Sequence, residues 1–535
     1  MHAFWKGVIA LGLITTSLAA IAQKPASTDV TIESGRIRGS ASDGVRSFKG
    51  IPFAAPPIGD NRWRAPQPVT PWSGVRQATA FGHDCMQKPF PSDAAPLGEV
   101  PSEDCLYLNV WRPDTPNAHK LPVMVWIYGG GYVNGGASPD VYDGSAFARD
   151  GVVLVSFNYR LGRFGFFAHP ALTNAQADGK TPLGNYGYMD QIAALNWVKR
   201  NIAQFGGDPN NVTVFGESAG GDSTLNLTIS PAAKGLFSRA AVMSGGGRVL
   251  MGELHDLSED RPGNPSAETI GLNFAESVGI EGTGPDALKA LRALPAEKVL
   301  GDLNMATLLS PSSGPVTYAG GPIRDGVIVT HTPQEAYSTG QQAQVPMLIG
   351  TTSADLGFSF AQTMHELFAP FGDNAERART LYDPQDSGDV QAIGAKIGMD
   401  RMMTEPARFI ARHVVETGQP AYLYRFSHVA EPMRDEWQGA PHASEIPYLF
   451  KTLEARYDGE LSDTDRVTAE AMHDYFVNFA KRGNPNGEEL PYWPRYTPQE
   501  DKLMNFTQTN GPLVEQDPWT ERLDLIQDLQ PSKTP

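Results

Sequence analysis

The sequence predicts an α/β protein with a large, mostly parallel twisted sheet and helices on both faces. Residues 122–128 and 152–157 are continuous apolar runs, which are typical of strands buried on both sides. Between 188 and 205 apolar residues recur at spacings of three and four, which predicts an amphipathic helix that ends at Gly206. Strands that alternate with helices in this way favour a parallel sheet.

The other elements can be placed in chain order. Residues 27–77 alternate short apolar runs with Pro and Gly, which predicts short antiparallel strands at the edge of the sheet. Further strands are expected at 212–215, 240–243, 345–349 and 421–426. A last helix is predicted from Asp463 to Lys481, because Ser462 is a good N-cap and Gly483 is a typical stop.

Two segments, 245–344 and 360–399, carry few strand signals and many Pro, Gly and Ser residues. We expect them to be insertions that cover the functional site at the edge of the sheet like a roof, not separate domains. The sequence shows no internal repeat of 20–50 residues, which argues against a solenoid.

The N-terminus predicts an export signal. Lys6 precedes an apolar run from Val8 to about Ala20, and Ala20-Ile21-Ala22 fits the small-x-small pattern of a cleavage site. The run is shorter than the ~20 residues of a spanning helix, and no second run follows. We therefore expect a signal peptide over 1–22, a mature chain over 23–535, no membrane span after cleavage, and a secreted or periplasmic location. The alternative is a retained N-terminal anchor.

The net charge limits the classes of partner that the chain can bind. The 43 basic and 60 acidic residues give a net charge of −17, which argues against nucleic acid and anionic lipid as partners.

Cys85 and Cys105 are the only cysteines, and an exported chain with one close pair favours a disulfide over two buried thiols. No His stands at ligand spacing from them, so no zinc site is expected.

The sequence Gly-Glu-Ser-Ala-Gly at 216–220 directly follows the strand predicted at 212–215. A serine on such a tight strand-to-helix turn is held exposed above the sheet, and flanking glycines avoid collisions there. Ser218 is therefore the candidate nucleophile. The alternative is a tight turn in which Ser218 only caps the helix.

Three consecutive glycines, 129–131, follow the strand predicted at 122–128. Glycines let backbone N–H groups approach the alkoxide that forms when serine attacks an ester carbonyl. The alternative is a flexible turn.

A base and an orienting acid should follow the serine in the order acid, then His. His442 lies on a turn-rich segment, 439–448, after the last strong strand. Asp355 follows the strand predicted at 345–349, within a loop bounded by glycines. From the residues alone, several other carboxylates remain possible as the acid.

Six segments in order resemble the type-B carboxylesterase family, which includes the cholinesterases, and in particular its exported bacterial branch. They are 48–53 (Phe-Lys-Gly-Ile-Pro-Phe), 102–109 (Ser-Glu-Asp-Cys-Leu-Tyr-Leu-Asn), 158–162 (Asn-Tyr-Arg-Leu-Gly), 184–187 (Gly-Asn-Tyr-Gly), 205–208 (Phe-Gly-Gly-Asp) and 215–221 (Phe-Gly-Glu-Ser-Ala-Gly-Gly). The likeness covers about 35–506. It implies an α/β-hydrolase fold in a single domain, without metal or organic cofactor, that acts on small-molecule esters.

The resemblance also implies roles for single residues. Ser218 corresponds to the nucleophile, His442 to the general base, Asp355 to the acid, Gly130, Gly131 and Ala219 to the oxyanion donors, and Cys85 and Cys105 to the family's first disulfide. The family's acid is usually Glu, so the Asp at 355 is a departure. Arg160 and Asp190 resemble a family ion pair, and Ser244 a buried hydroxyl behind the triad.

The expected activity is two-step acyl transfer on an ester. No Trp lies between Cys85 and Cys105, where cholinesterases carry one, so a choline ester is not expected. One hypothesis places Arg248 near the acyl group, where it would favour anionic polycarboxylate esters of the fumonisin type; the alternative is a surface arginine. An amidase, a carbamate or lactone hydrolase, and a non-catalytic binding protein of the same family are the rival functions.

Overall fold

The computed structural model describes residues 1, 28–90, 93–115, 118–176, 181–248, 254–308 and 314–529. Apart from Met1, the predicted signal peptide lies outside the described residues.

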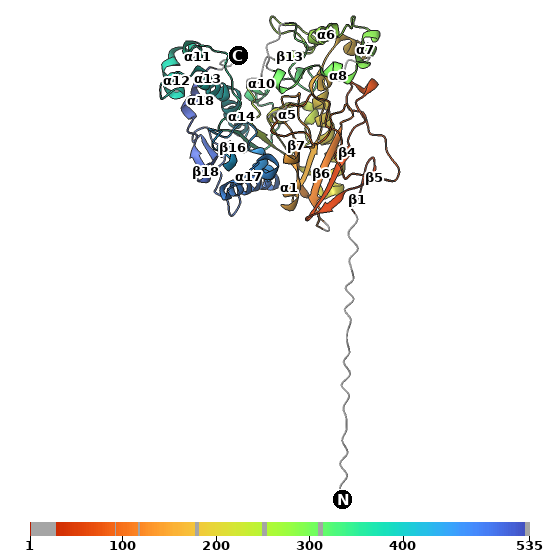
Figure 1. The fold of residues 1–535 in the computed structure, drawn as a ribbon, viewed down its shortest axis with the longest axis horizontal. Helices are drawn as coiled ribbons and strands as arrows, with labels where there is room; N and C mark the ends of the chain where they lie inside the picture. The colour runs from red at the N-terminus through yellow and green to blue at the C-terminus, as the bar shows by residue number, and fades with distance from the viewer. Residues whose placement is uncertain are drawn as a thin grey trace.

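An eleven-stranded sheet forms the centre of the fold, in the order β18-β17-β16-β15-β12-β11-β7-β8-β6-β4-β3. The strands from β17 to β8 in this order are parallel, whereas β18 at one edge and β6, β4 and β3 at the other pair antiparallel. The strands are β3 (Ser40–Ser42), β4 (Val45–Pro52), β6 (Tyr107–Pro113), β7 (Leu121–Ile127), β8 (Val153–Phe157), β11 (Gly207–Glu217), β12 (Arg239–Met243), β15 (Met347–Thr352), β16 (Ala421–Phe426), β17 (Lys502–Thr507) and β18 (Gly511–Gln516). The predicted fold class, α/β with a large, mostly parallel sheet, is confirmed (Figure 1).

The predicted strands all occur, with shifts at their ends. Every residue of β8 is buried, as its continuous apolar run indicates. The strand expected at 345 begins at Met347, after Pro346, because proline has no N–H to donate to a sheet. Of the strands predicted over 27–77, only β3 and β4 lie at the edge of the main sheet. In contrast to the prediction, β1 (Asp29–Ile32), β2 (Gly35–Arg38) and β5 (Val75–Gln77) form a separate sheet, in which β1 and β2 pair antiparallel and β5 pairs parallel with β2.

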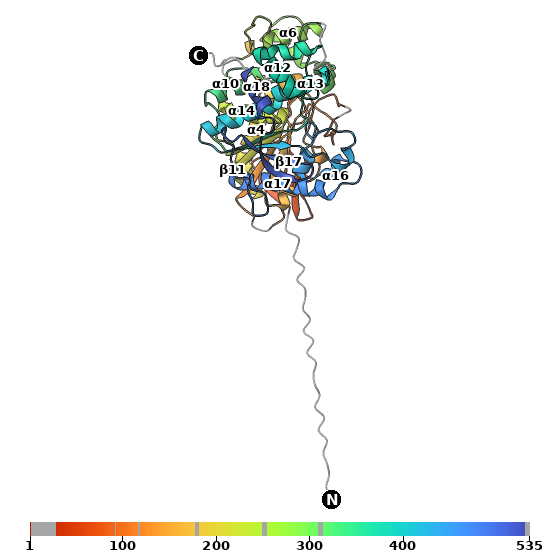
Figure 2. The same cartoon turned by 90° about the vertical axis from the view of Figure 1, so that its left-hand side faces the viewer.

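Two sets of helices cover the sheet. On one side, α1 (Ser145–Arg149), α15 (Ile446–Phe450) and α17 (Asp463–Arg482) pack around Trp126 and Phe215. On the second side, α5 (Ala219–Ile229) and α14 (Glu405–Glu416) pack against β11, β12, β15 and β16, and α10 (Pro333–Ser338) packs on these two helices. In two views at right angles, α14 and α17 lie on opposite sides of β16 and β17 (Figures 1 and 2).

Both predicted helices have the expected ends. Helix α4 (Tyr186–Asn201) continues as a 3₁₀ turn to Phe205 and stops at Gly206, whose φ is +84°. Helix α17 begins with a capping box at Ser462 and stops at Gly483, whose φ is +70°. A glycine accepts this left-handed conformation without the steric cost of a Cβ atom.

The two predicted insertions differ in what they cover. The first holds α6 (Ala267–Ser277), α7 (Pro285–Arg292), α8 (Ala296–Leu300) and α9 (Met305–Leu308), and supplies much of the wall of the cavity beside Ser218. The second holds α11 (Met364–Phe368), α12 (Ala375–Tyr382) and α13 (Val390–Met399), which pack with α18 (Thr520–Asp528) around a small core of their own. None of residues 360–399 lines that cavity, so the prediction that this second segment covers the site is not supported. The two groups stand apart above the strands in Figure 1.

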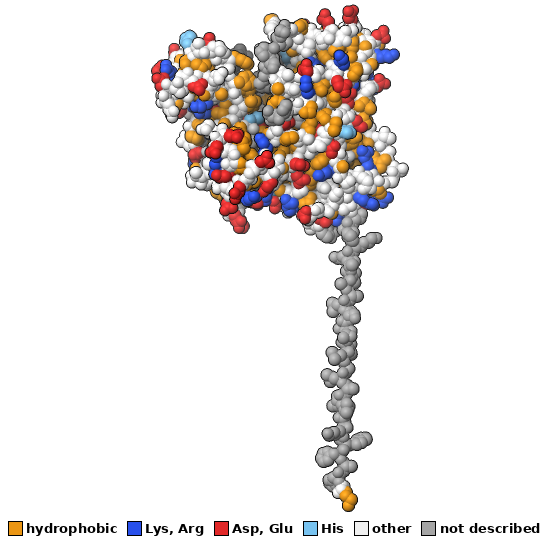
Figure 3. Space-filling view, viewed as in Figure 1, with side chains coloured by type: hydrophobic (Ala, Val, Ile, Leu, Met, Phe, Trp, Pro, Cys, Tyr) orange, Lys and Arg blue, Asp and Glu red, His pale blue; other side chains and the backbone are white. Residues whose placement is uncertain are grey.

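Acidic and basic side chains are interspersed on the face shown in Figure 3. Over the part of the chain that the structure describes, no helix combines the length and the apolar character needed to cross a bilayer.

Candidate active site

The proposed site residues follow the ends of neighbouring parallel strands. In the sheet register, Glu217 of β11 lies beside Met243 of β12, which lies beside Gly350 of β15. Ser218 and Ser244 each follow one of these strand ends, and their backbone N–H groups donate to Met243 (2.9 Å) and Gly350 (2.8 Å). Ligands of parallel α/β sheets bind at this carboxyl edge.

Ser218 lies on a strained turn between β11 and α5. Its φ is +56° and its ψ is −124°, a conformation that non-glycine residues rarely adopt. A Cβ on Gly220 would collide with the carbonyl oxygen of Ile127, and one on Gly129 would come within 2.9 Å of the Ser218 Cβ. The glycines therefore allow the nucleophile turn and the glycine-rich loop to pack directly against each other.

His442 and Asp355 are brought together as predicted. The His442 Nδ1 lies 2.5 Å from Asp355 Oδ1. Their two loops are joined by a bridge between Ala354 and Pro441 and by a hydrogen bond from Ala354 N to Ala440 O (2.8 Å). The acid therefore comes from the loop after β15, and the base from a loop that follows β16.

Asp355 is fully surrounded by donors. Its Oδ2 accepts from the Ser244 hydroxyl (2.6 Å) and from Thr352 N (3.0 Å), and its Oδ1 also accepts from Leu356 N (2.7 Å). Burial raises the pKa of Asp355, but the His442 charge and these hydrogen bonds outweigh burial and lower the pKa below its usual value. Asp355 is thus held ionised beside the imidazole, and Ser244 supports it from behind.

Glu217 is a site residue that the motif did not single out, because it occupies a variable position of G-x-S-x-G. Its Oε1 lies 3.1 Å from His442 Nε2, on the ring edge opposite Asp355. Within the described part of the chain, the Ser218 hydroxyl makes no hydrogen bond to His442. Burial lowers the pKa of His442, but Glu217 and Asp355 outweigh burial and raise it to about 10. Burial raises the pKa of Glu217 to about 7.

Three of the proposed site residues, Gly131, Ser218 and Ala219, line one cavity of about 440 Å³. Gly130, His442 and Asp355 do not line it. Gly130 and Gly131 have φ values of +105° and +60°, and Gly130 O accepts from Val133 N and Asn134 N. The glycine-rich loop is therefore a defined turn beside the serine.

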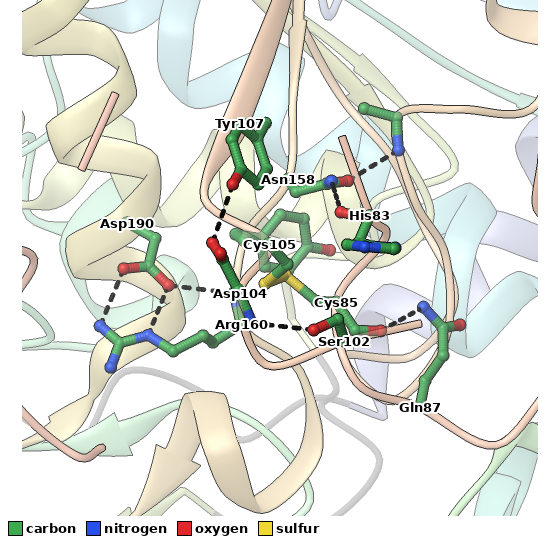
Figure 4. The surroundings of a disulfide bond; sticks show 12 residues. His83, Cys85, Gln87, Ser102, Asp104, Cys105, Tyr107, Asn158, Arg160 and Asp190 are labelled. Atoms are coloured by element: carbon green, nitrogen blue, oxygen red, sulfur yellow. Dashed lines mark hydrogen bonds and ion pairs between the residues drawn. A yellow bond between two sulfur atoms is a disulfide. The ribbon is translucent and has the colours of Figure 1, made fainter. Parts of the chain in front are cut away.

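The predicted disulfide between Cys85 and Cys105 is present (Figure 4). The loop that it closes also carries Gln87, whose amide pairs with the backbone of Gly135: Nε2 donates to Gly135 O (2.6 Å), and Gly135 N donates to Oε1 (2.9 Å). The Asn134 side chain donates to Gln87 Oε1 as well (3.2 Å). The disulfide loop thus supports the chain that leaves the glycine-rich loop.

The predicted ion pair between Arg160 and Asp190 lies beside the disulfide (Figure 4). Two hydrogen bonds of 2.8 Å join the guanidinium to the carboxylate, and both side chains are buried. This geometry agrees with a structural role.

The interpretation of Arg248 as a surface arginine is wrong, and its placement near the acyl group is not supported. Its side chain is only 6% exposed, so it is not a surface arginine. Its Nη1 lies 2.8 Å from Glu405 Oε1, its guanidinium covers the Phe409 ring at 4.3 Å, and it does not line the cavity beside Ser218. The arginine in the cavity wall is Arg163, which donates to the roof at Val299 O, Leu300 O and Thr317 O.

No group of three or more His, Cys, Asp and Glu side chains suited to a metal ion occurs within the ranges that the structure describes.

Comparison with known proteins decides the family. Residues 26–525 match the family model described as "Carboxylesterase family". The chain belongs to the carboxylesterase family. The match spans nearly the whole sequence, which confirms the resemblance and makes this protein a carboxylic ester hydrolase by class.

Members of the carboxylesterase family from several organisms are similar to this chain. It is 36% identical to a fumonisin B1 esterase of Sphingopyxis macrogoltabida, over 89% of this chain and 85% of that protein. It is 35% identical to a para-nitrobenzyl esterase of Bacillus subtilis, over 94% and 99%. Among solved structures, a carboxylesterase of Geobacillus stearothermophilus aligns with a TM-score of 0.75 at 34% identity, over 93% of this chain and 99% of that one.

Proposed function

We propose that this protein hydrolyses carboxylic esters through an acyl-enzyme intermediate on Ser218, with His442 as general base and Asp355 as its orienting acid. The observation that carries the proposal is the 2.5 Å contact of Asp355 with His442 Nδ1, set beside a serine on a strained strand-to-helix turn. A carboxylate on Nδ1 leaves Nε2 as the nitrogen that takes up a proton.

In the first step the Ser218 hydroxyl attacks the ester carbonyl, and His442 Nε2 takes the proton of that hydroxyl. The N–H groups of Gly130, Gly131 and Ala219 are proposed to stabilise the oxyanion. The imidazolium then protonates the leaving alcohol. In the second step the same imidazole takes a proton from water, which attacks the acyl-enzyme; the imidazolium then returns the proton to the Ser218 oxygen as its bond to the acyl group breaks and the acid is released.

The hydrogen bond from Ser218 to His442 is proposed to form when substrate is bound, since catalytic hydrogen bonds are often long or misaligned without substrate. Asp355 stabilises the imidazolium without itself accepting the proton.

The substrate is proposed to be a small-molecule ester. The fumonisin-type hypothesis has no support from Arg248, which pairs with Glu405 and does not line the cavity. Its remaining support is the likeness to a fumonisin B1 esterase. Amide, carbamate and lactone hydrolysis would use the same three residues; turnover of a matched ester and amide separates these activities.

We also propose export, with cleavage after residue 22 and a single mature domain over 23–535. The disulfide supports an oxidising compartment. N-terminal sequencing of the protein recovered from the periplasm or medium tests the cleavage site.

The decisive experiment is hydrolysis of p-nitrophenyl acetate, butyrate and octanoate by the wild type and by Ser218→Ala, with fluorophosphonate labelling of both. Loss of turnover and labelling together in the variant supports the serine-esterase function. A folded wild type that neither turns over nor labels favours a binding protein.

A further inference from the structure

A short side-chain hydrogen bond joins α5, the helix that follows Ser218, to the residue directly after the glycine-rich loop. The Tyr132 hydroxyl donates to Asp222 Oδ2 at 2.5 Å. Tyr132 directly follows Gly131, and Asp222 lies in the first turn of α5, four residues after Ser218. Both residues are at least nine-tenths buried. The bond therefore links the proposed oxyanion donors to the element that carries the nucleophile.

The backbone of Tyr132 is strained. Its φ is +62°, in the left-handed region that residues with a Cβ atom rarely adopt. Its C=O accepts from Gly162 N (2.7 Å), and its ring packs edge-on against Phe166 at 5.0 Å. Such conformations persist only where the surroundings hold them in place. The path of the chain after Gly131 therefore depends on how the Tyr132 side chain is anchored.

Asp222 is suited to be that anchor. Burial raises its pKa to about 6, which leaves the carboxylate mostly ionised at neutral pH. Burial and the Asp222 charge also keep the pKa of Tyr132 well above its usual value, so the phenol remains a donor. Asn226 Nδ2 shares Oδ2 (3.1 Å), and no ion pair to Asp222 exists in the described ranges. The bond to Tyr132 is thus a charge-assisted one between two largely buried side chains that also line the cavity beside Ser218.

We propose that Asp222 is a positioning residue for ester hydrolysis: through Tyr132, it fixes the glycine-rich loop 129–131 at the distance from Ser218 that oxyanion stabilisation needs. This inference rests on the proposed function. Oxyanion donors act mainly in the transition state, so their displacement lowers kcat more than it changes KM. A shift of about 1 Å in such a group can cost about 100-fold in rate.

The test uses Asp222→Ala, Tyr132→Phe, the double variant and Asp222→Asn, each assayed with p-nitrophenyl butyrate. Fluorophosphonate titration counts the active sites, so that kcat refers only to folded enzyme. We expect Asp222→Ala and Tyr132→Phe each to lower kcat about 10- to 100-fold with KM changed less than about three-fold. The double variant should be no worse than the worse single one, because each substitution already removes the bond between Tyr132 and Asp222. Asp222→Asn keeps an acceptor oxygen and should retain most of the activity.

A trifluoromethyl ketone gives a second readout, because its adduct with the serine places an oxyanion between the loop donors. Its affinity should fall in parallel with kcat in Asp222→Ala and Tyr132→Phe. The matched control is Tyr337→Phe, which removes another buried tyrosine hydroxyl bonded to α5, at Thr228 Oγ1 (2.8 Å), far along the helix from Ser218. It should lower the melting temperature without changing kcat per titrated site.

The inference is wrong if Asp222→Ala and Tyr132→Phe keep kcat within about two-fold of the wild type, or if their effects add in the double variant. If Asp222→Ala does not fold, Tyr132→Phe, with Asp222→Asn as its partner, decides the question. An inactive wild type, or an active Ser218→Ala, would instead contradict the proposed function, so the two failures can be told apart.

Discussion

Glu217 Oε1 lies 3.1 Å from His442 Nε2, while Asp355 Oδ1 lies 2.5 Å from Nδ1 of the same ring. The imidazole is therefore held between two buried carboxylates. In the proposed mechanism Asp355 orients the ring, and Glu217 occupies the side from which the Ser218 proton would arrive. This arrangement and the contacts around it lead to four predictions.

The first prediction concerns pH. The two carboxylates raise the pKa of His442, and the general base must be neutral to accept a proton. Activity should therefore rise with pH along a limb centred above 6.5, the ordinary imidazole value. In Glu217→Gln one negative charge is lost, the imidazolium is less stabilised, and the limb should move to lower pH. The measurement is kcat/KM against pH from 4.5 to 10.

Glu454→Gln, which removes an exposed carboxylate paired with Arg466, is the control for this shift and should leave the limb in place. A wild-type profile that is flat from pH 4.5 to 8, or the same limb in Glu217→Gln, would contradict the prediction.

The second prediction concerns the acid. Asp355→Asn removes the charge that stabilises the imidazolium and leaves an amide that favours the wrong tautomer, so kcat should fall about 10⁴-fold. Because Ser244, Thr352 and Leu356 still surround the side chain, the fold should persist. Steady-state kinetics with p-nitrophenyl butyrate and a thermal melt check both parts. Retention of a tenth or more of kcat would mean that another carboxylate is the acid.

The third prediction concerns the disulfide loop. Gln87→Ala removes the side-chain pairing with Gly135 but keeps the disulfide, so kcat should fall about 10-fold as the glycine-rich loop loses support. Gln67→Ala, which removes a side-chain amide that donates to the nearby Ala65 O (2.8 Å), is the matched control and should keep the wild-type rate.

The third prediction has a second part: removing the disulfide itself should act on stability. Replacing Cys85 and Cys105 by Ser should lower the free energy of unfolding by about 3 kcal/mol in the chain-entropy model for a loop of this length. Urea denaturation measures this change. An equally stable double serine variant would argue against it.

The fourth prediction concerns the buried ion pair. Asp190→Asn leaves the Arg160 guanidinium buried without a full counter-charge, which typically costs about 3–5 kcal/mol. The melting temperature should fall by several degrees, while kcat of the remaining folded enzyme should stay near the wild-type value. Glu500→Gln, at an exposed pair with Lys502, should change neither quantity. A large loss of kcat in the folded fraction of Asp190→Asn would point to a role beyond folding.

The local patterns of the chain were enough to predict the strands and helices of the central sheet. Buried parallel strands such as β8 need continuous apolar residues, and α17 needs a cap at Ser462 and a stop at Gly483. Each of these features depends on a few neighbouring residues, so it can be predicted from a short stretch of sequence. The order of the motifs likewise pointed to Ser218, His442 and Asp355, because each follows a predicted strand. The meeting of His442 with Asp355 then depended on the sheet order.

Contacts between distant segments could not be predicted in this way. Glu217 occupies a position that the motif leaves open, and its approach to His442 depends on where the loop after β16 folds back. Arg248 illustrates the same limit. Its position shortly after Ser244 in the chain suggested that it lies beside the cavity, yet its side chain pairs with Glu405, 157 residues later in the chain.

The sequence by itself determined the fold class, the family and the order of the candidate catalytic residues, since these depend on local periodicity and short motifs. Only the tertiary structure decided that Asp222 holds Tyr132, that Gln87 supports Gly135, and that Arg163 rather than Arg248 lines the cavity. Each of these contacts joins elements far apart in the chain, and their distance and burial, which set the energy of a polar contact, exist only once the sheet has assembled.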